Sequence, residues 1–301
     1  MRLSGSITAL ATPFTVAGEL DLDAWQRLLQ QQLDAGTQAV VVAGSTGEAA
    51  SLYGGEFDAL LRTAVEFVAG RVPVLAGTGQ ANTAKTIEQT RRAAALGADA
   101  ALVVAPAYVR PTQDGLLQHY GAIADDGALP VVMYNVPART ACDLLPATVA
   151  KLVAHPRVVG IKEASDEPGR IGEWLSLRRD GFAVLAGDDA CAARAMLDGA
   201  DGAVSVVSNV APRAFRRLCD LALSGREAET RAWDAKLHAL YDFAGVEPNP
   251  IPVKALLERL GIGHGLRLPL TSLSAAHQAT AARIADEIVG LEDSIPESIA
   301  A

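Results

Sequence analysis

The sequence has few cysteines, few histidines and little positive charge. Its three cysteines, Cys142, Cys191 and Cys219, are widely spaced and form no CxxC pair, which is typical of small buried residues in a reducing compartment. The five histidines form neither an HExxH motif nor a tight cluster, so we expect no metal site. A net charge of −9 and a pI near 5.1 argue against a nucleic-acid or anionic-membrane surface. An anionic substrate would therefore need a local cation.

Long apolar runs are also missing. No run reaches the roughly 18 residues that span a bilayer, and the N-terminus lacks a charged-then-apolar signal pattern. We therefore expect a soluble cytoplasmic protein. Half of the 301 residues are hydrophobic, so the chain can bury a large core, either as one domain with an extension or as two domains.

Short apolar segments recur along the chain, with helical patterns between them. One helical pattern covers residues 23–34 and stops at Gly36, and Asn82 can cap another that ends at Gly97. Eight strands are predicted, over residues 6–10, 39–43, 73–76, 100–105, 131–134, 158–162, 183–186 and 203–207.

Eight alternating β and α units, spaced by roughly 20–35 residues, predict a closed (β/α)8 TIM barrel of class α/β. The alternative is a doubly wound sheet, which usually has fewer strands and begins with a glycine fingerprint. The nearest candidate, residues 77–82, lacks the third glycine. Strand patterns stop near residue 210, so we assign 1–210 to the barrel and 211–301 to a C-terminal helical extension, with residues 292–301 expected to fray.

A lysine closes the sixth predicted strand. Strand alternation places Val158, Gly160 and Lys162 on one face, where the glycine would leave space beside the lysine stem. An amine buried there would be discouraged from carrying its proton, which is useful in catalysis. The alternative is a lysine whose charged end reaches solvent at the end of the strand.

Other polar residues follow the predicted strands at the end where barrel enzymes place their chemistry. Ser45 and Thr46 follow the second strand with flexible backbone amides, suited to a small carboxylate or to an ordinary turn. Tyr108 follows the fourth strand and Tyr134 ends the fifth, so either an active site or a rim lined by tyrosines fits. Arg139 can bind a carboxylate with its guanidinium or lie free on the surface.

The seventh strand is followed by Gly187, Asp188 and Asp189. Two carboxylates disfavour a phosphorylated substrate at this turn, although they serve equally well as helix N-caps. A buried lysine, a phenol, hydroxyls and an arginine at one barrel mouth describe Schiff-base chemistry on a carboxylic acid with a ketone. This chemistry needs no cofactor.

Four motifs carry a family resemblance that spans the barrel and continues into the extension. They are GSTGE at 44–48, YNVPART at 134–140, VGIKE at 159–163 and NPIPVK at 249–254. The chain resembles the dihydrodipicolinate synthase family, within the superfamily of pyruvate-dependent class I aldolases that includes N-acetylneuraminate lyase.

The resemblance implies a reaction and a role for each site residue. Lys162 would form an imine with pyruvate, and Tyr134 would move protons in a relay with Thr46 and with Tyr108 of a neighbouring subunit. Ser45 and Thr46 would hold the pyruvate carboxylate. Arg139 would bind the carboxylate of L-aspartate 4-semialdehyde.

Two further positions, Gly187 and Val204, match family residues whose backbone lines the pocket. The enamine would attack the aldehyde, and the new amine would close the ring as it displaces the lysine. Because Tyr108 must reach across an interface, the resemblance implies a homotetramer built as a dimer of dimers.

The chain also departs from the family pattern. Ser45 replaces a threonine and keeps the hydroxyl, whereas Ala107 replaces the first tyrosine of a pair. Residues 53–57 lack the histidines of members inhibited by L-lysine, and Lys85 stands where those members carry a glutamate. A cation there would repel a cationic effector, so we expect weak or absent inhibition by L-lysine.

Two other functions remain open from the sequence. One is a related pyruvate aldolase that acts on a sugar acid or on 4-hydroxy-2-oxoglutarate. The other is a non-catalytic barrel that only binds keto acids.

Overall fold

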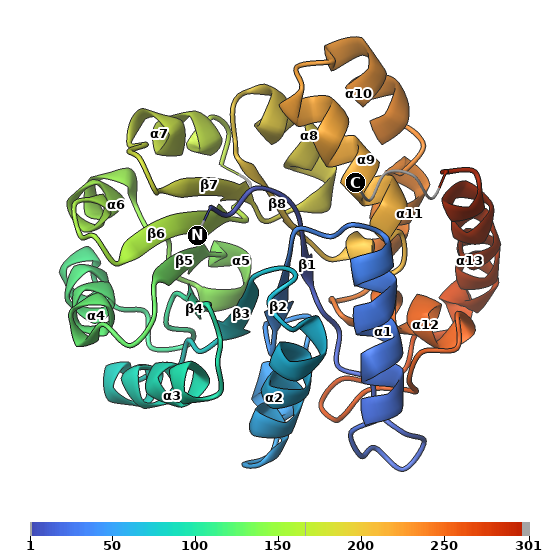
Figure 1. The fold of residues 1–301 in the computed structure, drawn as a ribbon, viewed down its shortest axis with the longest axis horizontal. Helices are drawn as coiled ribbons and strands as arrows, with labels where there is room; N and C mark the ends of the chain where they lie inside the picture. The colour runs from blue at the N-terminus through green and yellow to red at the C-terminus, as the bar shows by residue number, and fades with distance from the viewer. Residues whose placement is uncertain (1, 166, 297–301) are drawn as a thin grey trace.

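A computed structural model describes residues 2–165 and 167–296. Eight strands form one closed barrel in chain order, and every neighbouring pair is parallel, including β1 with β8 (Figure 1). The strands are β1 (Gly5–Ala9), β2 (Ala39–Val42), β3 (Val74–Gly77), β4 (Ala100–Val104), β5 (Val131–Asn135), β6 (Val158–Glu163), β7 (Ala183–Ala186) and β8 (Gly202–Ser205). The predicted (β/α)8 barrel is confirmed.

Each predicted strand lies within one or two residues of an observed one. The largest difference is at β8, which ends at Ser205 although the apolar run continues to Val207. The carboxylate of Asp189 accepts hydrogen bonds from the backbone N–H groups of Val206 and Val207, both at 3.0 Å. These bonds turn the chain into a 3-10 helix, η2 (Val207–Asn209), so a side chain from another unit ends this strand.

Alternate residues of the strands belong to two separate hydrophobic clusters. The inner cluster consists almost wholly of strand residues, such as Ile7, Val41 and Leu185, and it fills the barrel. The outer cluster joins the other strand face, such as Val40, to the helices, such as Leu28. The strands are therefore buried on both faces, as expected for a parallel sheet.

Strand β6 contains an irregularity that the sequence pattern did not predict. The register between β5 and β6 shifts after the Val131–Val158 pair. As a result Val158 lies in the outer cluster and Val159 packs against the inner one. The expectation that Val158 shares a face with Lys162 is therefore wrong, because an irregular step reverses the alternation.

Helices surround the barrel, and several begin at a side-chain cap. Asn82 accepts from the backbone N–H of Lys85 at 3.1 Å, as predicted, and Asp21 and Thr112 act in the same way. The helices are α1 (Leu22–Asp34), α2 (Glu56–Val68), α3 (Thr83–Ala95), α4 (Gln113–Asp126), α5 (Pro137–Thr140), α6 (Pro146–Val153), α7 (Arg170–Ser176), α8 (Asp189–Leu197), α9 (Pro212–Leu223), α10 (Glu227–Asp234), α11 (His238–Ala244), α12 (Ile251–Arg259) and α13 (Gln278–Asp293), with short 3-10 turns η1 (Ala49–Ser51) and η3 (Ala275–His277). Among the described residues, no helix is long and apolar enough to cross a membrane.

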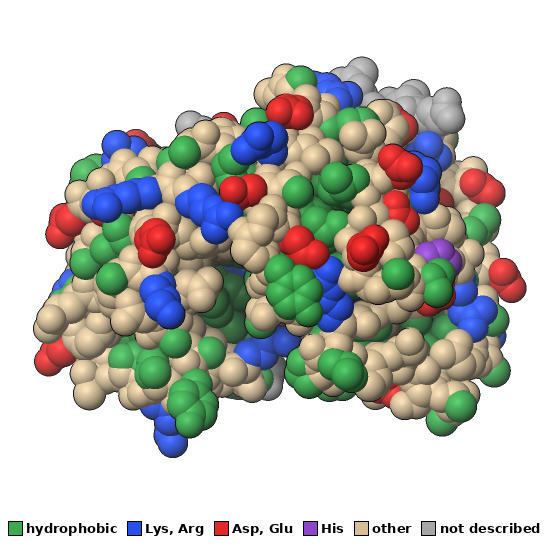
Figure 2. All heavy atoms as spheres, turned by 90° about the horizontal axis from the view of Figure 1, so that it is seen from below, with side chains coloured by type: hydrophobic (Ala, Val, Ile, Leu, Met, Phe, Trp, Pro, Cys, Tyr) green, Lys and Arg blue, Asp and Glu red, His purple; other side chains and the backbone are tan. Residues whose placement is uncertain are grey.

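The C-terminal helices gather on one side of the barrel (Figure 1). Helix α9 packs against β1 and β8 and so takes the place of the eighth barrel helix, although we assigned it to the extension. Glu292, near the end of α13, accepts from the backbone N–H groups of Arg213 and Ala214 at the start of α9. Ile295 is buried as well, so Glu292 and Ile295 pack against the rest of the protein; residues 297–301 lie outside the described residues, and the expected fraying of the tail stays a prediction. On the face shown in Figure 2, basic and acidic side chains of the described residues are interspersed.

Candidate active site

Lys162 and Tyr134 lie side by side inside the barrel. They are direct neighbours in the β5–β6 register, and the lysine Nζ is 4.2 Å from the centroid of the tyrosine ring. Their exposures are only 5% and 7%, so the amine does not reach solvent like a snorkelling lysine. Within the described chain, no carboxylate pairs with this lysine. The group that is shown to face the amine is the aromatic ring of Tyr134.

The space beside the lysine comes from a different glycine than the one we predicted. A Cβ added to Gly187 would lie 2.9 Å from the lysine Cε, whereas one added to Gly160 would meet Ala183 on β7. Gly187 follows β7 directly, and its N–H donates to the backbone oxygen of Glu163 at 2.6 Å. The missing side chain of Gly187 thus makes room for the stem of Lys162.

Ser45 and Thr46 form a tight turn after β2. The turn closes through a bond from the Glu48 N–H to the Ser45 carbonyl at 3.1 Å, and Glu48 itself adopts a left-handed backbone with φ of 51°. Thr46 is buried, and its Oγ1 accepts from the side-chain amide of Asn249 at 3.0 Å. The Ser45 hydroxyl bonds to no described residue, so its proton and lone pairs are available to a substrate.

Arg139 lies on the short helix α5 at the same mouth. Its side chain is exposed, and Nη2 donates to the backbone oxygen of Asn249 at 3.0 Å. Asn249 therefore joins the two predicted binding residues, Thr46 through its amide and Arg139 through its carbonyl. Sequence reasoning assigned no role to Asn249, although it opens the NPIPVK motif.

A second network supports β5 and β6 from outside the barrel. Glu163, next to the lysine, accepts from the Asn135 amide at 3.1 Å, from the Trp174 indole at 2.7 Å and from the Ser165 N–H at 2.7 Å. Asn135, next to the tyrosine, also donates to Asp143 at 2.7 Å. These bonds fix the backbone behind both inward-facing side chains. Sequence reasoning missed this support.

The aspartates after β7 both accept hydrogen bonds from backbone N–H groups. Asp188 accepts from the N–H of Ala190 at 2.9 Å, so it is the N-cap of α8. Asp189 is half-buried between α8 and the start of η2, and desolvation of its carboxyl raises the pKa of that group. The structure thus favours the N-cap alternative for Asp188, whereas Asp189 binds the backbone N–H groups that follow β8. Within the described residues, no group of three histidine, cysteine or acidic side chains could hold a metal ion.

Comparison with known proteins places this geometry in one family. The profile of the dihydrodipicolinate synthetase family matches residues 2–288. The chain belongs to this family. The 4-hydroxy-tetrahydrodipicolinate synthase of Xanthomonas axonopodis pv. citri (strain 306) is 65% identical over 292 residues, which cover 97% of each chain. That of Stenotrophomonas maltophilia (strain K279a) is 62% identical, covering 97% of this chain and 98% of the relative.

Solved structures of the dihydrodipicolinate synthase family share the fold. The chloride-inhibited enzyme from Acinetobacter baumannii, complexed with pyruvate, has a TM-score of 0.93 at 38% identity and covers 96% of this chain and 99% of its own. A monomeric dihydrodipicolinate synthase variant also has a TM-score of 0.93, at 40% identity, with 95% and 97% covered. The family resemblance predicted from four motifs is confirmed.

Val204, Tyr108 and Lys85 are the remaining residues singled out from the sequence, and they lie in different parts of the fold. Val204 on β8 is buried in the inner cluster with Tyr134. Tyr108, in the turn after β4, is 94% exposed and has a left-handed backbone with φ of 74°. Its phenol therefore points away from the interior of its own barrel. Lys85, which replaces the glutamate of lysine-inhibited members, is exposed on α3, and weak inhibition by L-lysine stays a prediction.

Proposed function

We propose that this chain is a 4-hydroxy-tetrahydrodipicolinate synthase. In this reaction, a lyase condenses pyruvate with L-aspartate 4-semialdehyde in the first committed step of lysine and diaminopimelate biosynthesis. The observation that carries the proposal is the buried Lys162 against the Tyr134 ring, in a chain 65% identical to a relative with this name. A structural neighbour is described as complexed with pyruvate.

The first half of the reaction makes a carbon nucleophile. The neutral amine of Lys162 attacks the ketone carbon of pyruvate, and loss of water leaves an iminium. The iminium withdraws electrons from the methyl group, which loses a proton to become an enamine. Ser45 and Thr46 hold the pyruvate carboxylate, and Tyr134 lies beside the amine to give and take these protons.

The second half joins the substrates and frees the lysine. Arg139 binds the carboxylate of the aldehyde acid, the enamine carbon attacks the aldehyde, and the aldehyde oxygen takes up a proton. The amine of the second substrate then attacks the iminium carbon, which closes the ring and releases Lys162. The backbones of Gly187 and Val204 line the space for these atoms. No step needs a cofactor.

The proton path and the assembly are linked. We infer that Tyr108 of one subunit completes the relay of Tyr134 and Thr46 in another, since Tyr108 is almost fully exposed on its own chain. A homotetramer built as a dimer of dimers would supply it. Mass photometry would test the assembly, and a functional monomer would contradict it. A cytoplasmic location also stays a prediction.

Borohydride trapping tests the covalent step. Reduction in the presence of pyruvate should leave a stable adduct on the peptide that contains Lys162, detected by mass spectrometry. Lys162→Ala should fold normally, form no adduct and lose turnover. An unmodified wild-type peptide would refute the proposal and favour a protein that only binds keto acids.

The second substrate needs its own comparison. Arg139 favours a short aldehyde that carries a carboxylate, which argues for aspartate semialdehyde over a sugar-derived aldehyde. We expect kcat/KM to be highest with aspartate semialdehyde. A higher value with a sugar-derived aldehyde or with 4-hydroxy-2-oxoglutarate cleavage would favour the related aldolases.

A further inference from the structure

A buried ion pair joins the extension to the turn that carries Ser45 and Thr46. Lys254 on α12 bonds to the carboxylate of Glu48, and their side chains are 4% and 0% exposed. Glu48 ends the GSTGE motif and Lys254 ends NPIPVK, so the pair connects segments that are far apart in the chain. The mechanism above gives neither residue a task.

A backbone N–H group and an aromatic ring contact the Glu48–Lys254 pair. The second carboxylate oxygen of Glu48 accepts from the backbone N–H of Arg267 at 3.1 Å. The Nζ of Lys254 lies 4.1 Å from the centroid of the Phe14 ring. Burial lowers the pKa of Lys254, and the nearby Glu48 opposes that shift. The site therefore holds two charges away from water.

Such an arrangement is poorly explained by stability alone. Desolvation costs several kcal/mol for each buried ion, and apolar residues of similar volume often stabilise a fold as well as the pair does. Glu48 also holds a left-handed backbone, with φ of 51°, which costs a non-glycine residue on the order of 1 kcal/mol. Two unfavourable features at one residue suggest a role in positioning.

The pair is one of several contacts on the same turn. Thr12 donates its hydroxyl proton to the backbone oxygen of Gly47 at 2.7 Å, and Asn249 donates to Thr46 at 3.0 Å. We propose that the Glu48–Lys254 pair is a positioning device that holds the Ser45–Thr46 turn in the conformation that binds the pyruvate carboxylate. This inference rests on the proposed function.

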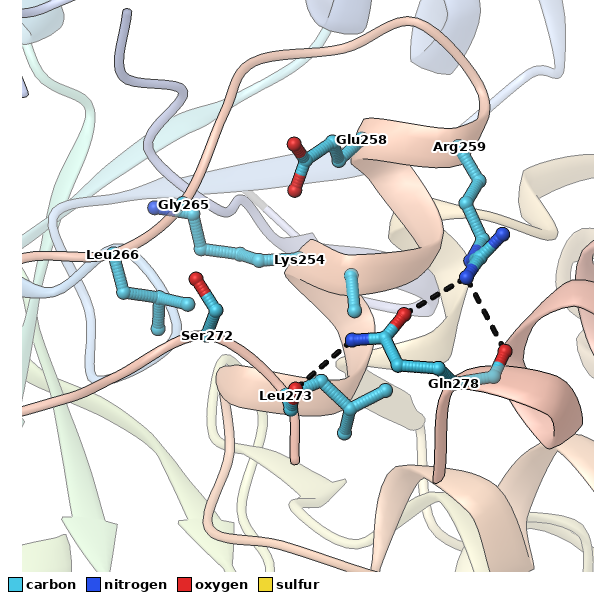
Figure 3. Close-up of a pocket in the computed structure, with 9 residues that line it drawn as sticks. Lys254, Glu258, Arg259, Gly265, Leu266, Ser272, Leu273 and Gln278 are labelled. Carbon is cyan, nitrogen blue, oxygen red and sulfur yellow. Dashed lines mark hydrogen bonds between the residues drawn. The ribbon is translucent and has the colours of Figure 1, made fainter. Parts of the chain in front are cut away.

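The surroundings of Lys254 allow a clean test. Lys254 lines a cavity of about 430 Å³ beside α12, and its side chain extends away from the Arg259–Gln278 contact in Figure 3. A methionine at this position would therefore not be overpacked. The double variant E48Q/K254M removes both charges and leaves an acceptor for the Arg267 N–H, so we expect it to fold.

The experiment measures borohydride trapping as a function of pyruvate concentration. For E48Q/K254M we expect a native circular dichroism spectrum and a roughly tenfold higher half-saturating pyruvate concentration, since small misplacements of binding groups have effects of this order. The KM for aspartate semialdehyde, measured at saturating pyruvate, should change less than twofold because the pair does not contact Arg139. The control R283M breaks the exposed Arg283–Glu287 pair of α13 and should behave like wild type.

Each other outcome counts against the inference. A folded double variant with wild-type pyruvate dependence would show that the pair serves stability alone. An equal rise in the half-saturating pyruvate concentration and in the KM for aspartate semialdehyde would show that the whole site, and not the Ser45–Thr46 turn in particular, has lost its packing. If the double variant does not fold, E48D keeps both charges but has a shorter side chain that retracts the carboxylate from Lys254, and unchanged pyruvate dependence in E48D would overturn the inference. Failure of trapping in wild-type protein would instead refute the proposed function.

Discussion

Gly187→Ala offers a direct test of how the lysine is accommodated. The added methyl carbon would lie 2.9 Å from the Cε of Lys162, 2.9 Å from the Cβ of Ala164 and 2.7 Å from the backbone oxygen of Glu163. Carbon atoms in ordinary contact are about 3.5–4.0 Å apart. The lysine stem must therefore move by about 0.6–1 Å, or the backbone after β7 must move instead.

The expected effect has two parts. Overpacking of this kind usually costs about 1–3 kcal/mol of unfolding free energy. A displacement of about 1 Å at a reacting group can lower a rate by about 10²-fold. We therefore expect the rate of pyruvate adduct formation, measured by quenching with borohydride at timed intervals, to fall about 30- to 100-fold. The free energy of unfolding, measured in urea, should fall by about 1–3 kcal/mol.

Gly160→Ala is the matched control. Its added carbon would lie 2.8 Å from the backbone oxygen of Ala183, a contact as severe as the one at Gly187, but no atom of Lys162 is among its nearest neighbours. We expect a similar loss of stability with an adduct rate within about threefold of wild type. A wild-type adduct rate in Gly187→Ala, or equal losses in both variants, would refute the role given to Gly187.

Two further predictions concern a tyrosine and a histidine. Tyr108→Phe should still form the pyruvate adduct but should turn over about 10²- to 10⁴-fold more slowly, because a lost proton donor has effects of this size; wild-type turnover would remove Tyr108 from the relay. Burial lowers the pKa of His119 from 6.5 to about 4, and its Nδ1 contacts the Thr83 hydroxyl at 2.9 Å. Below pH 6.5 His119 is protonated in the unfolded chain, whereas in the folded chain it stays neutral down to about pH 4. The free energy of unfolding should therefore fall by up to about 3 kcal/mol as the pH drops toward 4. In urea titrations at pH 7 and 4.5, His119→Gln should lose correspondingly less, and an equal loss would contradict this assignment.

Local patterns were sufficient to predict the barrel and to place two candidate site residues next to each other. Apolar runs bounded by turn signals define strands, and parallel strands place their ends at one mouth, so Lys162 and Tyr134 could be brought together from the sequence. The strand ends were less certain, as at Val207, because a capping carboxylate from another unit decides where β8 stops.

The contacts that hold the site together were not predictable in the same way. Asn249 meets Thr46, and Lys254 meets Glu48, across about two hundred residues of chain, and no periodicity encodes such pairs. The glycine beside the lysine was assigned wrongly because Gly187 comes from the turn after β7, and alternation within β6 says nothing about which residue of a neighbouring strand end lies against the lysine stem. Motif membership marked Asn249 and Lys254 as special without indicating their partners.

The two kinds of bond made by Asn249 differ in how they respond to mutation. Its carbonyl belongs to the peptide backbone, so any amino acid at this position presents the same oxygen to Arg139, whereas only the asparagine amide reaches Thr46. Substitution of Asn249 would thus remove its bond to Thr46 and keep its bond to Arg139, which under the proposed function disturbs the keto-acid side of the site and spares the aldehyde side. Laboratory evolution toward new aldehydes could vary the residues around Arg139 while this oxygen stays in place.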